Sequence, residues 1–173
     1  MTQYSKRMVI AHWLTLLLLI AAWFFGHELD EARHEGAATL TGYVVHILAG
    51  ASVLLVAVAR LFFRSQDGTP PPMGQTLMDK VAKGIHVLIY LMLILIPVTG
   101  MLTTLTSKVS DALFAWDPTL LPQKFSGVIA HDVHETLVNV LIVLVVIHVL
   151  GAIKHQFIMK DGVMDRMSLG RKD

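Results

Sequence analysis

The sequence predicts an all-α integral membrane protein, a bundle of four transmembrane helices. Of its 173 residues, 54% are hydrophobic and 16% are charged, and the charged residues cluster between long apolar runs. Apolar runs of about 20 residues have the length of a helix that crosses the hydrocarbon layer of a bilayer. The second informative feature is an excess of histidine: the chain has nine histidines but three tyrosines and three tryptophans.

Four apolar segments are expected to cross the membrane as parts of one domain, residues 1–173. Lys6 and Arg7 precede the first segment, which we interpret as a retained helix because no small-x-small cleavage motif of a signal peptide follows it. Pro97 and Gly100 lie inside the third segment and favour a kink there. The expected spans cover about residues 8–27, 40–63, 84–105 and 128–156.

Polar or proline-rich stretches connect the expected spans. Residues 28–41 hold four acidic residues and one arginine, and residues 106–127 form a second connection on the same side. Thr69–Pro72 reads TPPP, which ends the second helix because proline lacks a backbone donor. Arg60 and Arg64 lie at the end of the second span, where we expect their long side chains to extend towards the interface.

The distribution of basic residues predicts the orientation of the chain. Connections on the cytoplasmic side of membrane proteins carry an excess of Lys and Arg. Eleven of the fourteen Lys and Arg residues fall on one side of the four spans, so we expect both termini to be cytoplasmic. The eleven are Lys6, Arg7, Arg60, Arg64, Lys80, Lys83, Lys154, Lys160, Arg166, Arg171 and Lys172, and the other three are Arg33, Lys108 and Lys124.

The composition also excludes several classes of protein. The chain contains no cysteine, which rules out disulfides, cysteine-ligated iron–sulfur clusters and covalently attached c-type haem. The partner that the composition indicates is the lipid bilayer, and no nucleic-acid partner is expected. The sequence leaves the oligomeric state open.

The fourth span carries three histidines along one stripe. His134, His148 and His155 are spaced fourteen and seven residues apart, so at about 100° per residue they point in roughly the same direction. The rise of an α-helix separates His134 from His148 by about 21 Å, most of the thickness of the hydrocarbon layer. Two potential ligands near opposite faces of the membrane indicate a relay that carries something across it.

Two further histidines lie at the same two depths. His12 is about one turn inside the cytoplasmic end of the first span, as His148 is in the fourth. His46 lies near the outer end of the second span, as His134 does in the fourth. Because haem iron takes histidine as an axial ligand, we predict one haem between His12 and His148 and another between His46 and His134.

Other interpretations of the histidines stay open at this point. A histidine inside a membrane can serve as a hydrogen-bond group between helices. A zinc or copper transport site would gather its ligands within a few ångströms, whereas these lie in two layers.

The remaining candidate residues belong near the cytoplasmic interface or the outer surface. Three residues are candidates to contact a quinone headgroup or a haem propionate: His155, His86 and, one turn after His86, Tyr90. For His155, the alternative is a hydrated side chain at the interface. Gly50 and Gly151 follow two of the histidines and leave room for a flat macrocycle. Three histidines are expected to be solvated near the outer surface: His27, His34 and His131.

Several motifs resemble those of the bacterial cytochrome b561 family, in order and over nearly the whole chain. They are Tyr4-Ser5-Lys6-Arg7, His12-Trp13-Leu14, Arg60-Leu61 with Arg64, Thr69-Pro70-Pro71, His86 with Tyr90, His134-Glu135-Thr136-Leu137 with Asn139, and Lys160-Asp161 with Arg166-Met167. The resemblance implies a four-helix bundle in the bacterial inner membrane with two b-type haems. The implied axial ligands are His12, His148, His46 and His134. It also implies electron exchange with ubiquinone, and His155 matches a family histidine associated with the quinone site.

The resemblance is greatest to stand-alone members of the family that oxidise superoxide to dioxygen and reduce ubiquinone. We therefore expect an oxidoreductase in which electrons enter at the outer haem and leave from the cytoplasmic haem. The acidic connection at residues 28–41 departs from this pattern, because a basic entrance would steer the superoxide anion. The alternatives are a non-enzymatic electron-transfer subunit for a periplasmic redox partner and a metal transporter.

Overall fold

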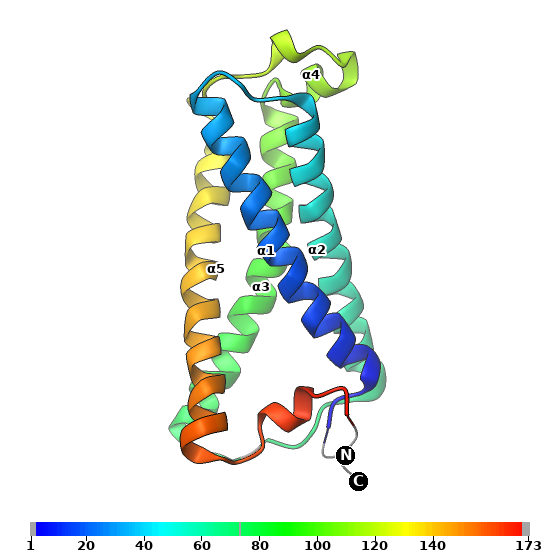
Figure 1. Cartoon of the computed structure of the whole chain (residues 1–173), viewed down its shortest axis with the longest axis vertical. Helices are drawn as coiled ribbons and strands as arrows, with labels where there is room; N and C mark the ends of the chain where they lie inside the picture. Colours follow the sequence, from blue (N-terminus) through cyan, green and yellow to red (C-terminus); the bar gives the residue numbers. More distant parts are fainter. Residues whose placement is uncertain (1–2, 73, 171–173) are drawn as a thin grey trace.

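Four long helices form the body of the protein and run along its longest axis (Figure 1). The computed structural model describes residues 3–72 and 74–170, and within those ranges it contains no strand. Each long helix is apolar enough and long enough to cross a membrane. This architecture confirms the predicted all-α bundle of four spans. The long helices are α1 (Lys6–His34), α2 (Leu40–Asp67), α3 (Leu77–Thr106) and α5 (Ile129–Ile153).

Short helices lie at the two ends of the bundle. The connection between α3 and α5 contains α4 (Val109–Ala115) and the 3-10 turn η1 (Pro118–Leu120), at the end far from the start of α1 (Figure 1). At the other end, α5 continues into a π-helical turn, η2 (Lys154–Met159), which is followed by a 3-10 turn, η3 (Met164–Met167).

Polar side chains mark the starts of the first three long helices. Ser5, Thr39 and Thr76 each accept a hydrogen bond from a backbone N–H of the first helical turn. Such caps satisfy donors that have no partner within the helix. Asp79 completes a capping box with Thr76 at the start of α3. At the end of α2, Gly68 adopts a φ of 71°, a conformation in which glycine meets no steric penalty.

The helices extend beyond the spans expected from hydropathy. α1 continues through the first part of the expected connection to His34, and α3 begins at Leu77. Hydropathy identifies the part of a helix that lies in lipid, whereas its ends are decided by capping and hydrogen bonding. The acidic residues Glu28, Asp30 and Glu31 therefore lie on the last turns of α1. Pro97 lies inside α3 without ending it.

The four helices pack as two pairs. α1 packs against α2, α3 packs against α5, and contacts between α2 and α3 join the pairs. A small core at mid-height is formed by Val53 and Ala57 of α2 with Leu93 of α3. Leu141 is the residue of α5 that is buried. Because α5 contributes so little to the buried core, its position in the bundle depends mainly on its packing against α3.

The C-terminal segment crosses one end of the bundle and contacts the beginning of the chain (red in Figure 1). The backbone N–H of Tyr4 donates to the carbonyl of Arg166 at 3.2 Å. The indole N–H of Trp13 donates to the carbonyl of Met167 at 3.1 Å, and the Arg166 guanidinium donates to the carbonyl of Pro71 at 2.7 Å. These bonds tie the tail to the start of α1 and to the connection between α2 and α3.

The chain reversals bring the expected cytoplasmic segments together. The starts of α1 and α3 and the ends of α2 and α5 share one end of the bundle (Figure 1). Most of the eleven basic residues that predict the orientation belong to these segments; Arg171 and Lys172 lie outside the described residues. The face of the membrane on which this end lies stays a prediction.

Candidate functional site: two layers of paired histidines

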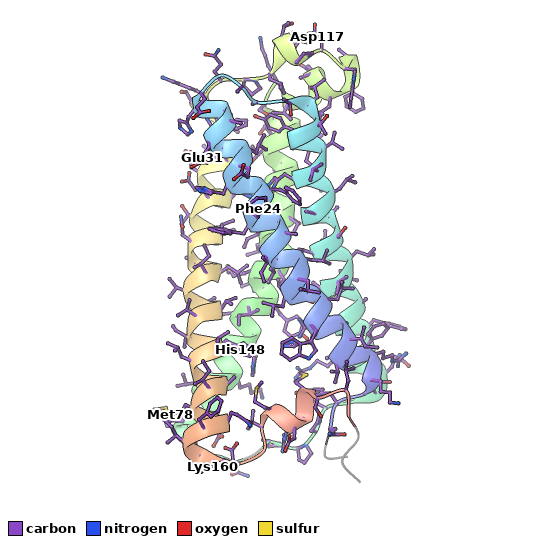
Figure 2. The ribbon with its side chains drawn as sticks, viewed as in Figure 1. Phe24, Glu31, Met78, Asp117, His148 and Lys160 are labelled. Carbon is purple, nitrogen blue, oxygen red and sulfur yellow. The ribbon has the colours of Figure 1, made fainter. Side chains whose placement is uncertain are left out.

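Two pairs of histidines from different helices face each other at two levels of the bundle. His46 of α2 and His134 of α5 have ring centroids 6.2 Å apart, and we call them the outer pair. His12 of α1 and His148 of α5 also have centroids 6.2 Å apart, and we call them the inner pair. Figure 2 labels His148 on α5. The structure thus brings together the residues that the sequence placed at matching depths, while their role as ligands stays a prediction.

The spacing within each pair suits a metal held between the rings. An imidazole binds a metal at about 2.0–2.1 Å, and the ring nitrogen lies about 1.1 Å from the ring centroid, so two trans ligands have centroids about 6.3 Å apart. Both pairs match this distance. Within the described residues, no group of three or more His, Cys, Asp or Glu could hold a metal ion. Paired ligands therefore fit an iron whose other ligands come from a macrocycle better than they fit a tetrahedral transport site.

The outer pair is oriented by backbone carbonyls. Nδ1 of His46 lies 3.2 Å from the carbonyl oxygen of Ala22, and Nδ1 of His134 lies 2.9 Å from that of Ile96. A carbonyl can only accept, so Nδ1 carries the proton in both rings and the Nε2 lone pair stays available to a metal. A hydrogen bond from the ring nitrogen that does not bind the metal is characteristic of metal-binding histidines.

Glycine makes these carbonyls accessible to the rings. Gly26 follows Ala22 by four residues on α1, and Gly100 follows Ile96 by four residues on α3. A Cβ at Gly26 would lie 2.8 Å from Cε1 of His46, and a Cβ at Gly100 would lie 3.0 Å from Cε1 of His134. The sequence did not point to Gly26, and Gly100 was expected only to favour a kink. Each glycine nevertheless follows, by four residues, the residue whose carbonyl a histidine contacts.

The inner pair has polar neighbours instead. Nη2 of Arg60 lies 3.2 Å from Nδ1 of His12, and the Arg60 guanidinium lies over the Tyr90 ring at 5.0 Å. His86 approaches His148 edge-on, with centroids 5.0 Å apart. The structure therefore brings His86 and Tyr90 into the inner layer, beside the haem-ligand candidates. The expectation that Arg60 extends towards the interface is wrong, because its side chain turns into the bundle and Arg60 is buried, whereas Arg64 is exposed.

The third histidine of the α5 stripe lies beyond the inner pair. His155 belongs to η2, and its Nδ1 lies 2.6 Å from a carboxylate oxygen of Asp161. This hydrogen bond lowers the pKa of the Asp161 carboxyl, so the carboxylate stays ionised at neutral pH. The pair is partly exposed, which leaves His155 accessible to a ligand at this end of the bundle.

The other histidines and glycines named from the sequence lie apart from the two pairs. His27 and His34 are exposed and lie near acidic residues of α1. The His131 ring contacts Phe125, with centroids 4.4 Å apart. At two further glycines, Gly50 and Gly151, a Cβ would meet nothing within 4 Å apart from adjacent residues and the backbone of the same helix.

The fold defines the class of protein, a multi-pass membrane protein whose helices carry two layers of paired histidines. A family model described as prokaryotic cytochrome b561 matches residues 3–170, and the chain belongs to this family. It is 28% identical to cytochrome b562 of Cereibacter sphaeroides over 95% of this chain and 94% of that protein. It is 27% identical to cytochrome b561 homolog 1 of Escherichia coli over 99% of this chain and all of that protein. It is 25% identical to the probable superoxide oxidase CybB of Yersinia pestis, over 95% of each chain.

Membership of the family gives the general biochemistry. The protein is a bacterial membrane cytochrome that binds haem b and takes part in electron transfer. Its four apolar helices embed it in a lipid bilayer.

The glycines beside the outer pair allow a direct test of this site. Gly26→Ala or Gly100→Ala should displace the adjacent imidazole, because the new methyl group would lie within about 3 Å of Cε1. We expect haem content to fall and the absorption bands of one haem to weaken. Gly84→Ala is the matched control, since a Cβ there meets nothing within 4 Å. Unchanged haem content and spectra in both variants would contradict this view of the outer pair.

Proposed function

We propose that the protein is a di-haem b oxidoreductase of the bacterial inner membrane that passes electrons from the periplasmic side to ubiquinone. Superoxide is the proposed electron donor. The observation that carries the proposal is the equal spacing of 6.2 Å in two histidine pairs contributed by three helices. The similarity to the probable superoxide oxidase of Yersinia pestis supports the choice of donor.

The residues of the chain have distinct roles in this function. His46 and His134 would hold the outer haem, and His12 and His148 would hold the inner haem. Haem b supplies a centre that accepts and releases one electron at a time. The carbonyl hydrogen bonds of the outer pair fix the ring orientation before a metal binds.

The proposed reaction balances with two superoxide anions for each quinone. Each superoxide loses one electron and becomes dioxygen, and the quinone gains two electrons and two protons to become quinol. The protons must reach the quinone from the cytoplasmic side. The His155–Asp161 pair lies at that end, where the imidazole can hold and transfer a proton while Asp161 orients the ring.

The first prediction of the proposed function concerns haem content and the haem ligands. We expect two haems b per chain by pyridine haemochrome assay against protein mass. His46→Ala or His134→Ala should leave one haem, and His12→Ala or His148→Ala should leave the other, because each substitution removes one of the two histidines that would hold a haem. His34→Ala is the control and should keep both haems, because His34 is exposed at the end of α1. One haem or none in the unaltered protein would reject the proposal.

The second prediction concerns quinone. His155→Ala should keep both haems but slow their reoxidation by a soluble ubiquinone analogue by at least about tenfold, because proton transfer to the quinone loses its donor. Asp161→Asn should slow the same step by a smaller factor. His27→Ala, exposed on α1, serves as the control. Stopped-flow reoxidation that is equally fast in all variants would place the quinone elsewhere, with His86 and Tyr90 as the next residues to test.

The distribution of charge at the outer end bears on superoxide as the donor. Lys124 lines two shallow hollows, one of about 250 Å³ shared with Arg33 and one of about 490 Å³ shared with Lys108. Arg33 forms an ion pair with Asp30, which neutralises much of its charge. Lys108 and Lys124 therefore supply the local positive charge that would attract an anion among acidic neighbours.

The third prediction tests this attraction. Lys124→Gln should lower the bimolecular rate of haem reduction by superoxide by about tenfold, because electrostatic steering is lost. The rate in the unaltered protein should also fall as salt is raised, since exposed charges are screened beyond about 10 Å at 0.1 M. Lys83→Gln, at the other end of the bundle, should leave the rate unchanged. Absence of haem reduction by superoxide at every salt concentration would exclude superoxide as the donor.

The outer end also supports a second candidate, an electron-transfer subunit that receives electrons from a periplasmic protein. Phe114 of α4 is 89% exposed and Trp116, just after α4, is 64% exposed. Aromatic side chains are enriched at protein–protein interfaces, so these two residues are candidates for a docking surface. Under this candidate, both haems would be present and quinone would be reduced, but superoxide would not reduce the haems.

A further inference from the structure

Arg60 is a buried cation whose hydrogen bonding is incomplete. Only 7% of the residue is exposed. One terminal nitrogen donates to the Thr15 hydroxyl at 3.3 Å, and the other lies 3.2 Å from Nδ1 of His12. The Nε–H, which is also buried, has no hydrogen-bond partner. The guanidinium thus presents at least one free donor inside the bundle.

No anion balances this charge within the described residues. Arg60 takes part in none of the salt bridges there, and its polar neighbours Thr15, His12 and Tyr90 carry no negative charge. The other charged side chain that acts on it is Arg64, which has the same sign. An ionised side chain in a membrane is costly and is normally paired or placed beside water. Among the described residues, Arg60 therefore lacks the negatively charged partner that would balance a buried cation.

The contact between Arg60 and His12 also indicates that an acceptor is missing beside Arg60. If Nε2 of His12 holds iron as a neutral imidazole, Nδ1 must carry the ring proton. The Nη2 group of Arg60 and Nδ1 of His12 are then both donors, 3.2 Å apart, and neither can accept from the other. The loaded site consequently needs an acceptor beside Arg60. The outer pair has no such conflict, because its Nδ1 atoms face carbonyl oxygens.

We propose that Arg60 binds a propionate carboxylate of the haem held by His12 and His148. The planar guanidinium offers Nε–H and a terminal N–H as parallel donors, the arrangement that matches two carboxylate oxygens. Thr15 and the face of Tyr90 hold the guanidinium in place through a hydrogen bond and a cation–π contact. This inference rests on the proposed di-haem function.

A positive charge beside the inner haem also changes its affinity for electrons. A cation stabilises the reduced form, which carries one more negative charge, so loss of Arg60 should lower the reduction potential of the inner haem. A tenfold change in the equilibrium constant corresponds to about 59 mV for one electron. The outer haem should keep its potential, because Arg60 contacts the inner pair alone.

The experiment compares purified, haem-loaded protein with the variants Arg60→Met, Arg60→Lys and Arg64→Met. Haem labelled with carbon-13 in its propionate carboxyl groups identifies the carboxylate bands in redox difference infrared spectra. We expect Arg60→Met to shift the labelled bands of one haem and lower its potential by about 59 mV, tenfold in the equilibrium constant. Arg60→Lys keeps the charge but loses the paired donors, so it should shift the bands while changing the potential less. Arg64→Met, exposed and one turn away, should change neither.

The outcomes separate this inference from the function on which it rests. Protein that contains no haem would reject the di-haem function itself. Two haems with labelled bands that are the same in the unaltered protein and in Arg60→Lys and Arg60→Met would overturn the propionate contact alone. A lowered potential without any change in the labelled bands would also overturn it, because the partner of Arg60 would then be another anion. If Arg60→Met does not fold, the band shift expected in Arg60→Lys decides the question.

Discussion

Imidazoles from different helices approach each other across the bundle at two levels. α5 packs against α3 and adds one residue to the buried core, yet it supplies a histidine to each pair. The partner histidines come from α1 and α2, which pack on each other. A group held between the rings would therefore connect the two halves of the bundle as well as carry out redox chemistry. Under the proposed function, the paired histidines would therefore serve both haem binding and the packing of the helices.

The outer and inner histidine pairs differ in the groups that surround them. The outer rings are held by carbonyls that glycines leave accessible, so the surroundings are neutral. The inner layer contains the buried Arg60 cation and a third imidazole, His86. A positive charge stabilises an added electron, so a haem held in the inner layer would be the better electron acceptor under the proposed function. Under the proposed function, this asymmetry favours electron flow from the outer end towards the end where His155 lies.

The tail links that end of the protein to the rest of the fold. Its hydrogen bonds with Tyr4, Trp13 and Pro71 close the chain across the open end of the bundle. Asp161, at the start of the same segment, fixes His155. A quinone at this position would thus contact a residue whose orientation depends on the correct docking of the tail. The partly exposed His155–Asp161 pair agrees with a site that exchanges both ligand and protons with its surroundings.

The sequence by itself determined the four spans, the all-α class, the family and the matching depths of the four histidines, because hydropathy and helical spacing are properties of consecutive residues. It did not determine the ends of α1 and α3, where capping extends the helix past the apolar segment. The role of Gly26, the inward turn of Arg60 and the approach of His86 to His148 were decided by tertiary structure alone. Each depends on which neighbouring helix stands opposite a given residue, and no periodicity within one helix carries that information.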